Sequence, residues 1–173
     1  MSETRKKHFW IISELFYPDE TSTAYILTCI ARRLSSEYDV HVICGRSRCS
    51  MARTPDFKVS VHACGKSTIS GRNLAMRAIR MIILTCRLVF AGFRFIRKHE
   101  PILIVTNPAP LMVGITLLKK LKKSRMTLLV HDVFPENALA AGIFSSDNGF
   151  VYRLLQSVFN HAYRAADQLI VGA

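Results

Sequence analysis

The sequence lacks the short motifs that mark common nucleotide and metal sites. Neither GxGxxG nor GxxxxGK[ST] occurs in its 173 residues, which disfavours a dinucleotide-binding or P-loop enzyme. Gly65-Lys66-Ser67 resembles the end of a P-loop but lacks the first glycine upstream. The five cysteines form no CxxC pair, so we expect buried, reduced thiols in a cytosolic protein rather than a disulfide or metal framework.

Acidic residues are scarce relative to basic ones. The chain has 24 Lys and Arg but 12 Asp and Glu, a formal net charge of +12. This excess favours an anionic partner: nucleic acid, phospholipid or a phosphorylated substrate. No apolar signal-peptide core follows the basic first residues, so secretion is not expected. The length predicts one domain over residues 1–173, because two full domains would be a tight fit.

Short apolar runs alternate with helical patterns along the whole chain. The strands are predicted at residues 8–13, 39–44, 57–62, 102–106, 126–131 and 168–171. The helices are predicted from Thr21 or Ser22 to 37, over about 71–98, 111–122 and 149–166, with one short turn after Pro135. This alternation predicts an α/β fold: a Rossmann-like, doubly wound, mainly parallel sheet with helices on both faces.

Polar, proline-containing loops follow three of these strands, at residues 14–22, 106–110 and 131–137. In an open α/β sheet the ligand binds beyond the carboxyl ends of the strands, near the point where the strand order reverses. We therefore expect a site among these three loops.

The first of these loops brings Glu20, Thr21 and Ser22 to the start of a helix. Free backbone N–H groups and the positive end of the helix dipole attract phosphate or carboxylate there. Alternatively, Thr21 or Ser22 only caps the helix. The sequence leaves both interpretations open.

His131 and Asp132 follow the fifth predicted strand. A histidine beside an acid at this place can hydrogen-bond a substrate hydroxyl or polarise a leaving group. The alternative is a loop histidine that is hydrogen-bonded to the backbone.

Three segments together resemble family 4 retaining glycosyltransferases, in particular those that build capsule, colanic-acid (exopolysaccharide) and lipopolysaccharide O-antigen repeat units. They are WIISELFYPDETSTAY (10–25), TNPAP (106–110) and HDVFPEN (131–137). The resemblance implies a GT-B fold, in which two Rossmann-like domains enclose the active site. This chain would be the N-terminal, acceptor-side domain, and the C-terminal domain that binds the nucleotide-sugar would be absent from it.

The same resemblance implies roles for individual residues. His131 matches the histidine that contacts the transferred sugar, and Asp132 follows it as the second catalytic candidate. Substrate binding would involve Glu20, Thr21, Ser22, Asn107 and Glu136. Many family members have a glycine pair in the first loop, and this chain has none. No cofactor is implied, and retaining transfer in this fold is expected to need no bound metal.

The long helix predicted after Gly71 is apolar around most of its circumference and carries one basic stripe, Arg80, Arg87, Arg94 and Lys98. Three central arginines cost more on insertion than the apolar residues gain, so a transmembrane span is not expected. We predict a helix that lies on a bilayer with its basic stripe among lipid phosphates. The alternative is a crossover helix that packs on the sheet and exposes an arginine edge.

A second basic cluster, residues 119–125, is typical of a solvated helix end. Nucleic acid is not expected, because no reader module is present and the basic residues are not interleaved with aromatics.

These observations lead to one main functional expectation. The chain would be part of a glycosyltransferase that moves a sugar from a nucleotide-sugar to a membrane-linked polyprenyl-diphosphate saccharide, in cell-surface polysaccharide synthesis. It would be cytoplasmic and peripheral on the inner face of the plasma membrane, and inactive without its donor-binding half. The alternative is a non-catalytic, membrane-associated module that recruits a separate donor-binding subunit.

Overall fold

The structure is a computed structural model that describes residues 6–45, 58–65, 74–140, 142 and 149–171. Strands and helices alternate along these residues, as the sequence predicts. In chain order they are β1 (His8–Ser13), α1 (Ser22–Leu34), β2 (Asp39–Cys44), β3 (Val59–Ala63), α2 (Leu74–Phe95), β4 (Ile102–Val105), α3 (Pro110–Lys122), β5 (Met126–Val130), α4 (Glu136–Ala140), α5 (Phe150–Ala165) and β6 (Gln168–Val171).

The strands form one six-stranded sheet in the order β3-β2-β1-β4-β5-β6. Every neighbouring pair is parallel. The chain builds outward from β1 to β3 and then returns to place β4 on the other side of β1, so the order reverses between β1 and β4. The predicted α/β, Rossmann-like fold is confirmed, and its reversal point lies between two of the predicted site loops.

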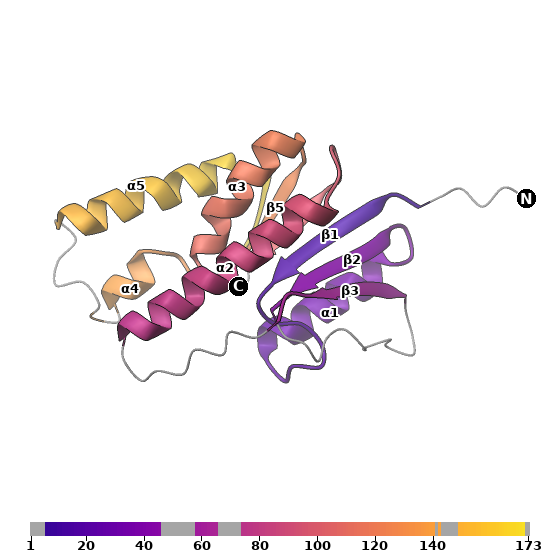
Figure 1. Cartoon of the computed structure of the whole chain (residues 1–173), viewed down its shortest axis with the longest axis horizontal. Helices are drawn as coiled ribbons and strands as arrows, with labels where there is room; N and C mark the ends of the chain where they lie inside the picture. Colours follow the sequence, from indigo (N-terminus) through magenta and orange to yellow (C-terminus); the bar gives the residue numbers. More distant parts are fainter. Residues whose placement is uncertain (1–5, 46–57, 66–73, 141, 143–148, 172–173) are drawn as a thin grey trace, which may run out of the picture.

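Helices cover both faces of the sheet, as predicted (Figure 1). α1 contributes Leu27 and Ala31 to the hydrophobic core on one face. On the other face α2, α3 and α5 contribute Leu88, Ile115 and Phe159 to a second core. Within the described ranges α1 therefore packs on one face of the sheet, and α2, α3 and α5 form a layer on the other.

The first part of α2 extends beyond the carboxyl edge of the sheet (Figure 1). None of residues 75–83 is buried, and Leu84 is the first buried side chain described in this helix. Leu84 is level with the end of β2, because a Cβ atom added to Gly45 would lie 2.9 Å from its Cδ1 atom. The start of α2 and the predicted site loops therefore lie at the same edge of the sheet.

α2 ends at Phe95 instead of Lys98. The Glu100 carboxylate accepts hydrogen bonds from the backbone N–H of Arg97 at 2.8 Å and from Trp10 Nε1 at 2.7 Å. These bonds hold the chain in a turn that returns it to the sheet, and a helix through Lys98 would break them.

α1 is also shorter than predicted and ends at Leu34. The hydroxyls of Ser35 and Ser36 donate to backbone carbonyls three residues earlier, at 2.7 and 2.8 Å. Such local bonds compete with continued helix, which is why serine favours helix ends. β3 runs from Val59 to Ala63, and the predicted start at residue 57 lies outside the described residues.

Candidate functional site

The three predicted site loops leave the sheet at one edge, from adjacent strands. They follow β1, β4 and β5, and β4 pairs with both of the others. Each loop contains one cis X–Pro bond, at Tyr17–Pro18, Asn107–Pro108 and Phe134–Pro135. The parallel topology thus brings together loops that lie far apart in the sequence.

Thr106 joins the loop after β4 to the loop after β5. It is 2% exposed, and its Oγ1 atom accepts hydrogen bonds from the backbone N–H groups of His131 and Asp132, each at 3.1 Å. The sequence predicts strands that end at Thr106 and at His131, but β4 ends at Val105 and β5 at Val130. Sequence reasoning missed the anchoring role of Thr106, and its only signal was a hydroxyl directly after a buried apolar strand.

Asp132 is fixed by the start of α4. Its Oδ1 atom accepts a hydrogen bond of 2.8 Å from Asn137 Nδ2. Among the described residues no hydrogen bond joins the Asp132 carboxylate to the His131 ring. The acid therefore shapes its own loop, and its position gives no sign that it orients the imidazole.

Tyr163 of α5 also holds the loop at residues 131–137. The backbone N–H of Phe134 donates to the Tyr163 hydroxyl at 3.2 Å, and that hydroxyl donates to the Asp132 carbonyl at 3.4 Å. Burial raises the pKa of Tyr163, the Phe134 bond opposes this, and the negative charges of Glu136 and Asp132 raise the pKa further. The neutral phenol can therefore keep its donor role. Nothing in the sequence indicated this contact.

The His131 side chain is exposed at the carboxyl edge. Its backbone is held by Thr106, but in the described part of the chain its ring has no hydrogen-bond partner. This differs from the alternative in which a loop histidine is bonded through its ring to the backbone. The imidazole is thus free to meet a ligand.

Thr21 is the N-cap of α1, one of the two roles that the sequence left open. Its Oγ1 atom accepts a hydrogen bond of 3.2 Å from the backbone N–H of Ala24. Glu20, Thr21 and Ser22 all have exposed side chains, so capping does not prevent them from meeting a ligand.

The remaining predicted substrate-binding residues lie on the other two loops. Asn107 is exposed and follows Thr106 directly, while Glu136 is exposed in the first turn of α4. The contacts through Thr106 bring Asn107, His131 and Asp132 into one tied group.

The basic residues predicted to contact a membrane, Arg80, Arg87, Arg94 and Lys98, are all exposed. The outward face of α2 also carries Ile79, Ile82 and Phe90, which are 44%, 53% and 73% exposed. Within the described ranges, α2 and the other helices are too short or too polar to cross a bilayer. The basic stripe of α2 therefore lies beside exposed apolar side chains of the same helix.

The second basic cluster is tied to its surroundings. Lys119 Nζ lies 2.7 Å from Asp167 Oδ2, and Lys122 Nζ donates to the Phe93 carbonyl at 3.0 Å. These lysines connect α3 to the start of β6 and to α2, so the prediction of a merely solvated helix end is incomplete.

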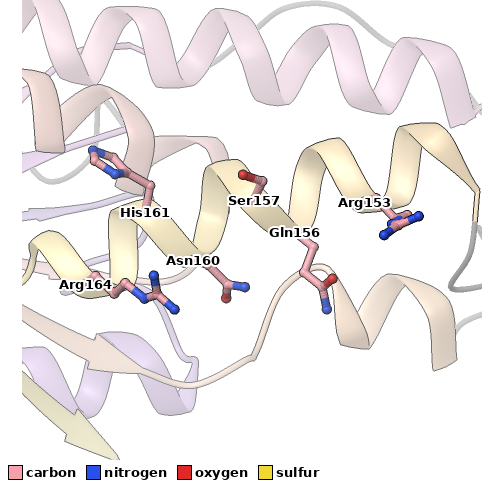
Figure 2. A pocket seen from close by; sticks show the side chains of 6 residues that line it. All are labelled: Arg153, Gln156, Ser157, Asn160, His161 and Arg164. Carbon is pink, nitrogen blue, oxygen red and sulfur yellow. The ribbon is translucent and has the colours of Figure 1, made fainter.

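One open groove of about 420 Å³ lies along α5 (Figure 2). All its lining residues come from that helix: Arg153, Gln156, Ser157, Asn160, His161 and Arg164. Lys120 of α3 adds a hydrogen bond of 3.1 Å between its Nζ atom and His161 Nε2. The groove is positive and polar, but a single helix forms it, so it offers an anion a platform and no enclosed site.

The fold and its polar carboxyl edge define the chain as a Rossmann-like α/β protein. No family model matches it. One similar protein is a Pseudomonas aeruginosa protein named "Probable glycosyltransferase WbjE", which is 43% identical over 75 residues. The aligned segment covers 43% of this chain and 18% of that protein, so the chain matches much less than half of the relative's length. This similarity supports a role for the chain as part of a glycosyltransferase.

Proposed function

We propose that this chain is the acceptor-side half of a glycosyltransferase. It would work with a donor-binding half, from another segment or a separate subunit, to move a sugar from a nucleotide-sugar to a polyprenyl-diphosphate saccharide at the membrane. The observation that carries the proposal is the 43% identity to a probable glycosyltransferase. The Rossmann-like sheet, with its polar loops at the point where strand order reverses, supports it.

In this proposal the tied loops present His131 to the transferring sugar. Thr106 fixes the two peptide groups that flank His131, so the backbone that carries the exposed imidazole is in place before substrate arrives. A donor that is placed near developing charge stabilises the transition state. Asn107 and Glu136 would contact hydroxyls of the acceptor sugar.

The start of α1 would meet a phosphate. Capping by Thr21 satisfies the backbone N–H of Ala24, while other first-turn N–H groups can still bind an anion at the positive end of the helix dipole. Ser22 adds an exposed hydroxyl. A diphosphate, whether of the donor or of the lipid-linked acceptor, fits this chemistry.

Membrane contact by the outer surface of the helix layer is the second part of the proposal. Exposed apolar side chains lie on all three helices of that layer: Ile79, Ile82, Phe90, Val113, Leu117, Leu121, Val151, Leu154 and Val158. Large apolar side chains that gather on one exposed surface often mark contact with a membrane or a partner. Arg80, Arg87 and Arg94 flank it and are long enough to reach lipid phosphates.

In this proposal α2 lies both at the membrane and near the candidate site. The first part of α2 extends past the carboxyl edge of the sheet (Figure 1), where His131 and the other loop residues lie. A bilayer against this helix would bring a lipid-linked acceptor close to those loops.

The reaction is tested with the chain in its native gene context, expressed in bacterial membranes. Labelled nucleotide-sugars are supplied with polyprenyl-diphosphate saccharide, and labelled lipid product is measured. We expect labelled product with the donor-binding half present and none from the chain alone. If the complete assembly transfers no sugar from any nucleotide-sugar while remaining folded, the proposal is wrong. Transfer that appears only on adding a separately encoded subunit would show that the donor-binding half is a separate chain.

Membrane contact is tested with vesicles that contain phosphatidylglycerol. Binding should need the anionic lipid and weaken with salt, because attraction between surface charges is screened over about 8–10 Å. Changing Arg80, Arg87 and Arg94 together to Gln should reduce it. Arg32 and Arg33 at the end of α1, on the other side of the sheet, provide a control pair. Binding that is the same in both variants would refute the role of the stripe.

A further inference from the structure

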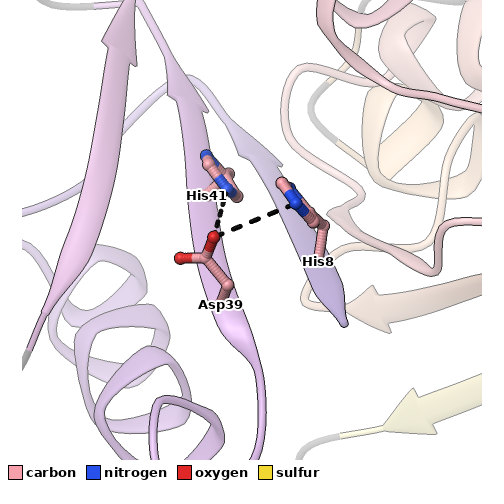
Figure 3. Close-up of side chains that lie close together, drawn as sticks. All are labelled: His8, Asp39 and His41. Atoms are coloured by element: carbon pink, nitrogen blue, oxygen red, sulfur yellow. Dashed lines mark hydrogen bonds and ion pairs between the residues drawn. The ribbon is translucent and has the colours of Figure 1, made fainter. Parts of the chain in front are cut away.

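A histidine cluster lies at the amino-terminal edge of the sheet, where β1 and β2 begin. The strand register pairs His8 with Asp39 and Trp10 with His41, which puts His8, Asp39 and His41 on one face. The Nε2 atom of His41 lies 3.3 Å from Asp39 Oδ2, and that of His8 lies 4.0 Å from the same oxygen (Figure 3). The proposed transfer reaction uses none of these groups.

We propose that His8, Asp39 and His41 bind a divalent transition-metal ion of the zinc class. Imidazole nitrogen and carboxylate oxygen are ordinary zinc ligands, and three protein ligands leave a fourth position for water. The three donor atoms lie within 4.8 Å of one another. Because no lysine or arginine forms an ion pair with Asp39 among the described residues, its charge is available to the cation.

One of the three pairs of donor atoms already has the separation that such a site needs. Bonds of about 2.0–2.1 Å in a tetrahedron place two ligand atoms about 3.3 Å apart. The His41–Asp39 separation already matches, while the His8–Asp39 separation of 4.0 Å must shorten by about 0.7 Å. The His8 ring must also turn out of its stack on His41, because a metal ion lies in the plane of each imidazole that binds it. The side chains of His8 and Asp39 are 27% and 50% exposed, so surface packing leaves them room to move.

A second histidine contact supports His41 as a ligand. A metal-bound imidazole usually donates the N–H of its other nitrogen to an acceptor, which fixes its tautomer. The Nδ1 atom of His41 lies 3.3 Å from His62 Nε2. His62 Nε2 can accept this bond when the proton of that ring is on Nδ1. His62 stacks in turn on Phe95, with ring centroids 4.6 Å apart.

The rings of His8 and His41 are stacked, with centroids 4.8 Å apart and planes at 3°. Both lie beside the Asp39 carboxylate (Figure 3). A stack of aromatic rings that needs no metal is the rival account, and metal titration separates the two. An ion here would join the starts of two adjacent strands at the edge opposite His131. It would therefore stabilise the sheet and take no part in sugar transfer, and the inference does not rest on the proposed function.

The test uses the full chain, freed of any purification tag and of metal, and titrated with Zn²⁺ by calorimetry and with Co²⁺ by visible absorption. We expect one saturable Zn²⁺ site per chain, a rise in Tm with Zn²⁺, and the strong visible bands of four-coordinate Co²⁺. Cys29 and Cys86 are exposed, so the prediction of buried thiols is wrong for these two. Replacing both by serine should leave all three signals unchanged.

Variants assign the ligands. His8→Gln and Asp39→Asn, both at partly exposed positions, should each lower Zn²⁺ affinity at least about 10-fold while leaving the metal-free Tm near wild type. His62→Phe keeps an aromatic ring against Phe95 but removes the acceptor, and should weaken binding by about 10–100-fold. His99→Asn, at an exposed histidine elsewhere, is the control. No saturable binding, or binding that His8→Gln and Asp39→Asn leave intact, would overturn the proposal.

Discussion

Replacing Thr106 by valine removes the oxygen that accepts hydrogen bonds from the backbone N–H groups of His131 and Asp132 but keeps the side-chain shape. Both bonds are 3.1 Å long and Thr106 is 2% exposed. A buried donor left without a partner costs about 1–3 kcal/mol. Because residues 131 and 132 are exposed, water can partly satisfy the freed groups. We therefore expect Thr106→Val to lower the free energy of unfolding by about 2–4 kcal/mol in total.

Urea denaturation followed by circular dichroism measures this change, and Thr106→Ser is the matched control. Serine keeps the accepting oxygen and loses one methyl group, which costs about 1 kcal/mol. In the complete enzyme Thr106→Val should also lower kcat, since it releases the backbone that positions His131. A Thr106→Val protein as stable as the Thr106→Ser protein would show that the hydroxyl does not hold the two loops together.

Three further outcomes are expected. Thr21→Ala removes the cap of α1 and should lower the free energy of unfolding by about 1 kcal/mol. In the complete enzyme it should also raise KM if the same hydroxyl contacts a ligand. An unchanged KM would show that Thr21 acts only as the helix cap. Ile82→Ser with Phe90→Ser should weaken binding to anionic vesicles about 10-fold or more, whereas Tyr25→Ser, at a position 72% exposed on α1, should not; equal losses would disprove a specific lipid-facing surface. Although partial burial opposes it, hydrogen bonds from Lys119 and from the Met126 backbone lower the pKa of Asp167 below 3.8. A lowered folded-state pKa stabilises above the unfolded value and is lost as pH falls through the folded value, so the stability gap between wild type and Asp167→Asn should shrink as pH drops below about 4 in acid titrations.

The fold could be predicted because local signals agreed with one another. β1, β2 and β6 begin and end where the apolar runs place them, and Thr21 caps α1 as its position suggests. Errors arose at ends that depend on tertiary contacts. Nothing in the local pattern of α2 shows that Glu100 will accept hydrogen bonds from Arg97 and Trp10, so the helix was extended too far.

The candidate site was only partly predictable. The loops at residues 106–110 and 131–137 could be chosen because parallel strands deliver their carboxyl ends to one edge. The contacts of Thr106 and Tyr163 with the second loop span 25 to 31 residues in sequence, and no spacing rule reveals them. The proposed metal ligands His8 and Asp39 are likewise brought together by the β1–β2 register alone. Their separation in sequence matches no metal-binding motif.

The most direct test of the central claim is the turnover of a folded His131→Ala enzyme in the complete assembly. If His131 contacts the transferring sugar where charge develops, kcat should fall by about 10²-fold or more. The Tm should stay near that of wild type, since the ring has no hydrogen-bond partner within the described residues. His161→Ala, at an exposed histidine on α5, should keep wild-type turnover and serves as the control. Turnover of the His131→Ala enzyme within about a factor of two of wild type, where a lost transition-state contact should cost far more, would contradict the assignment of this site.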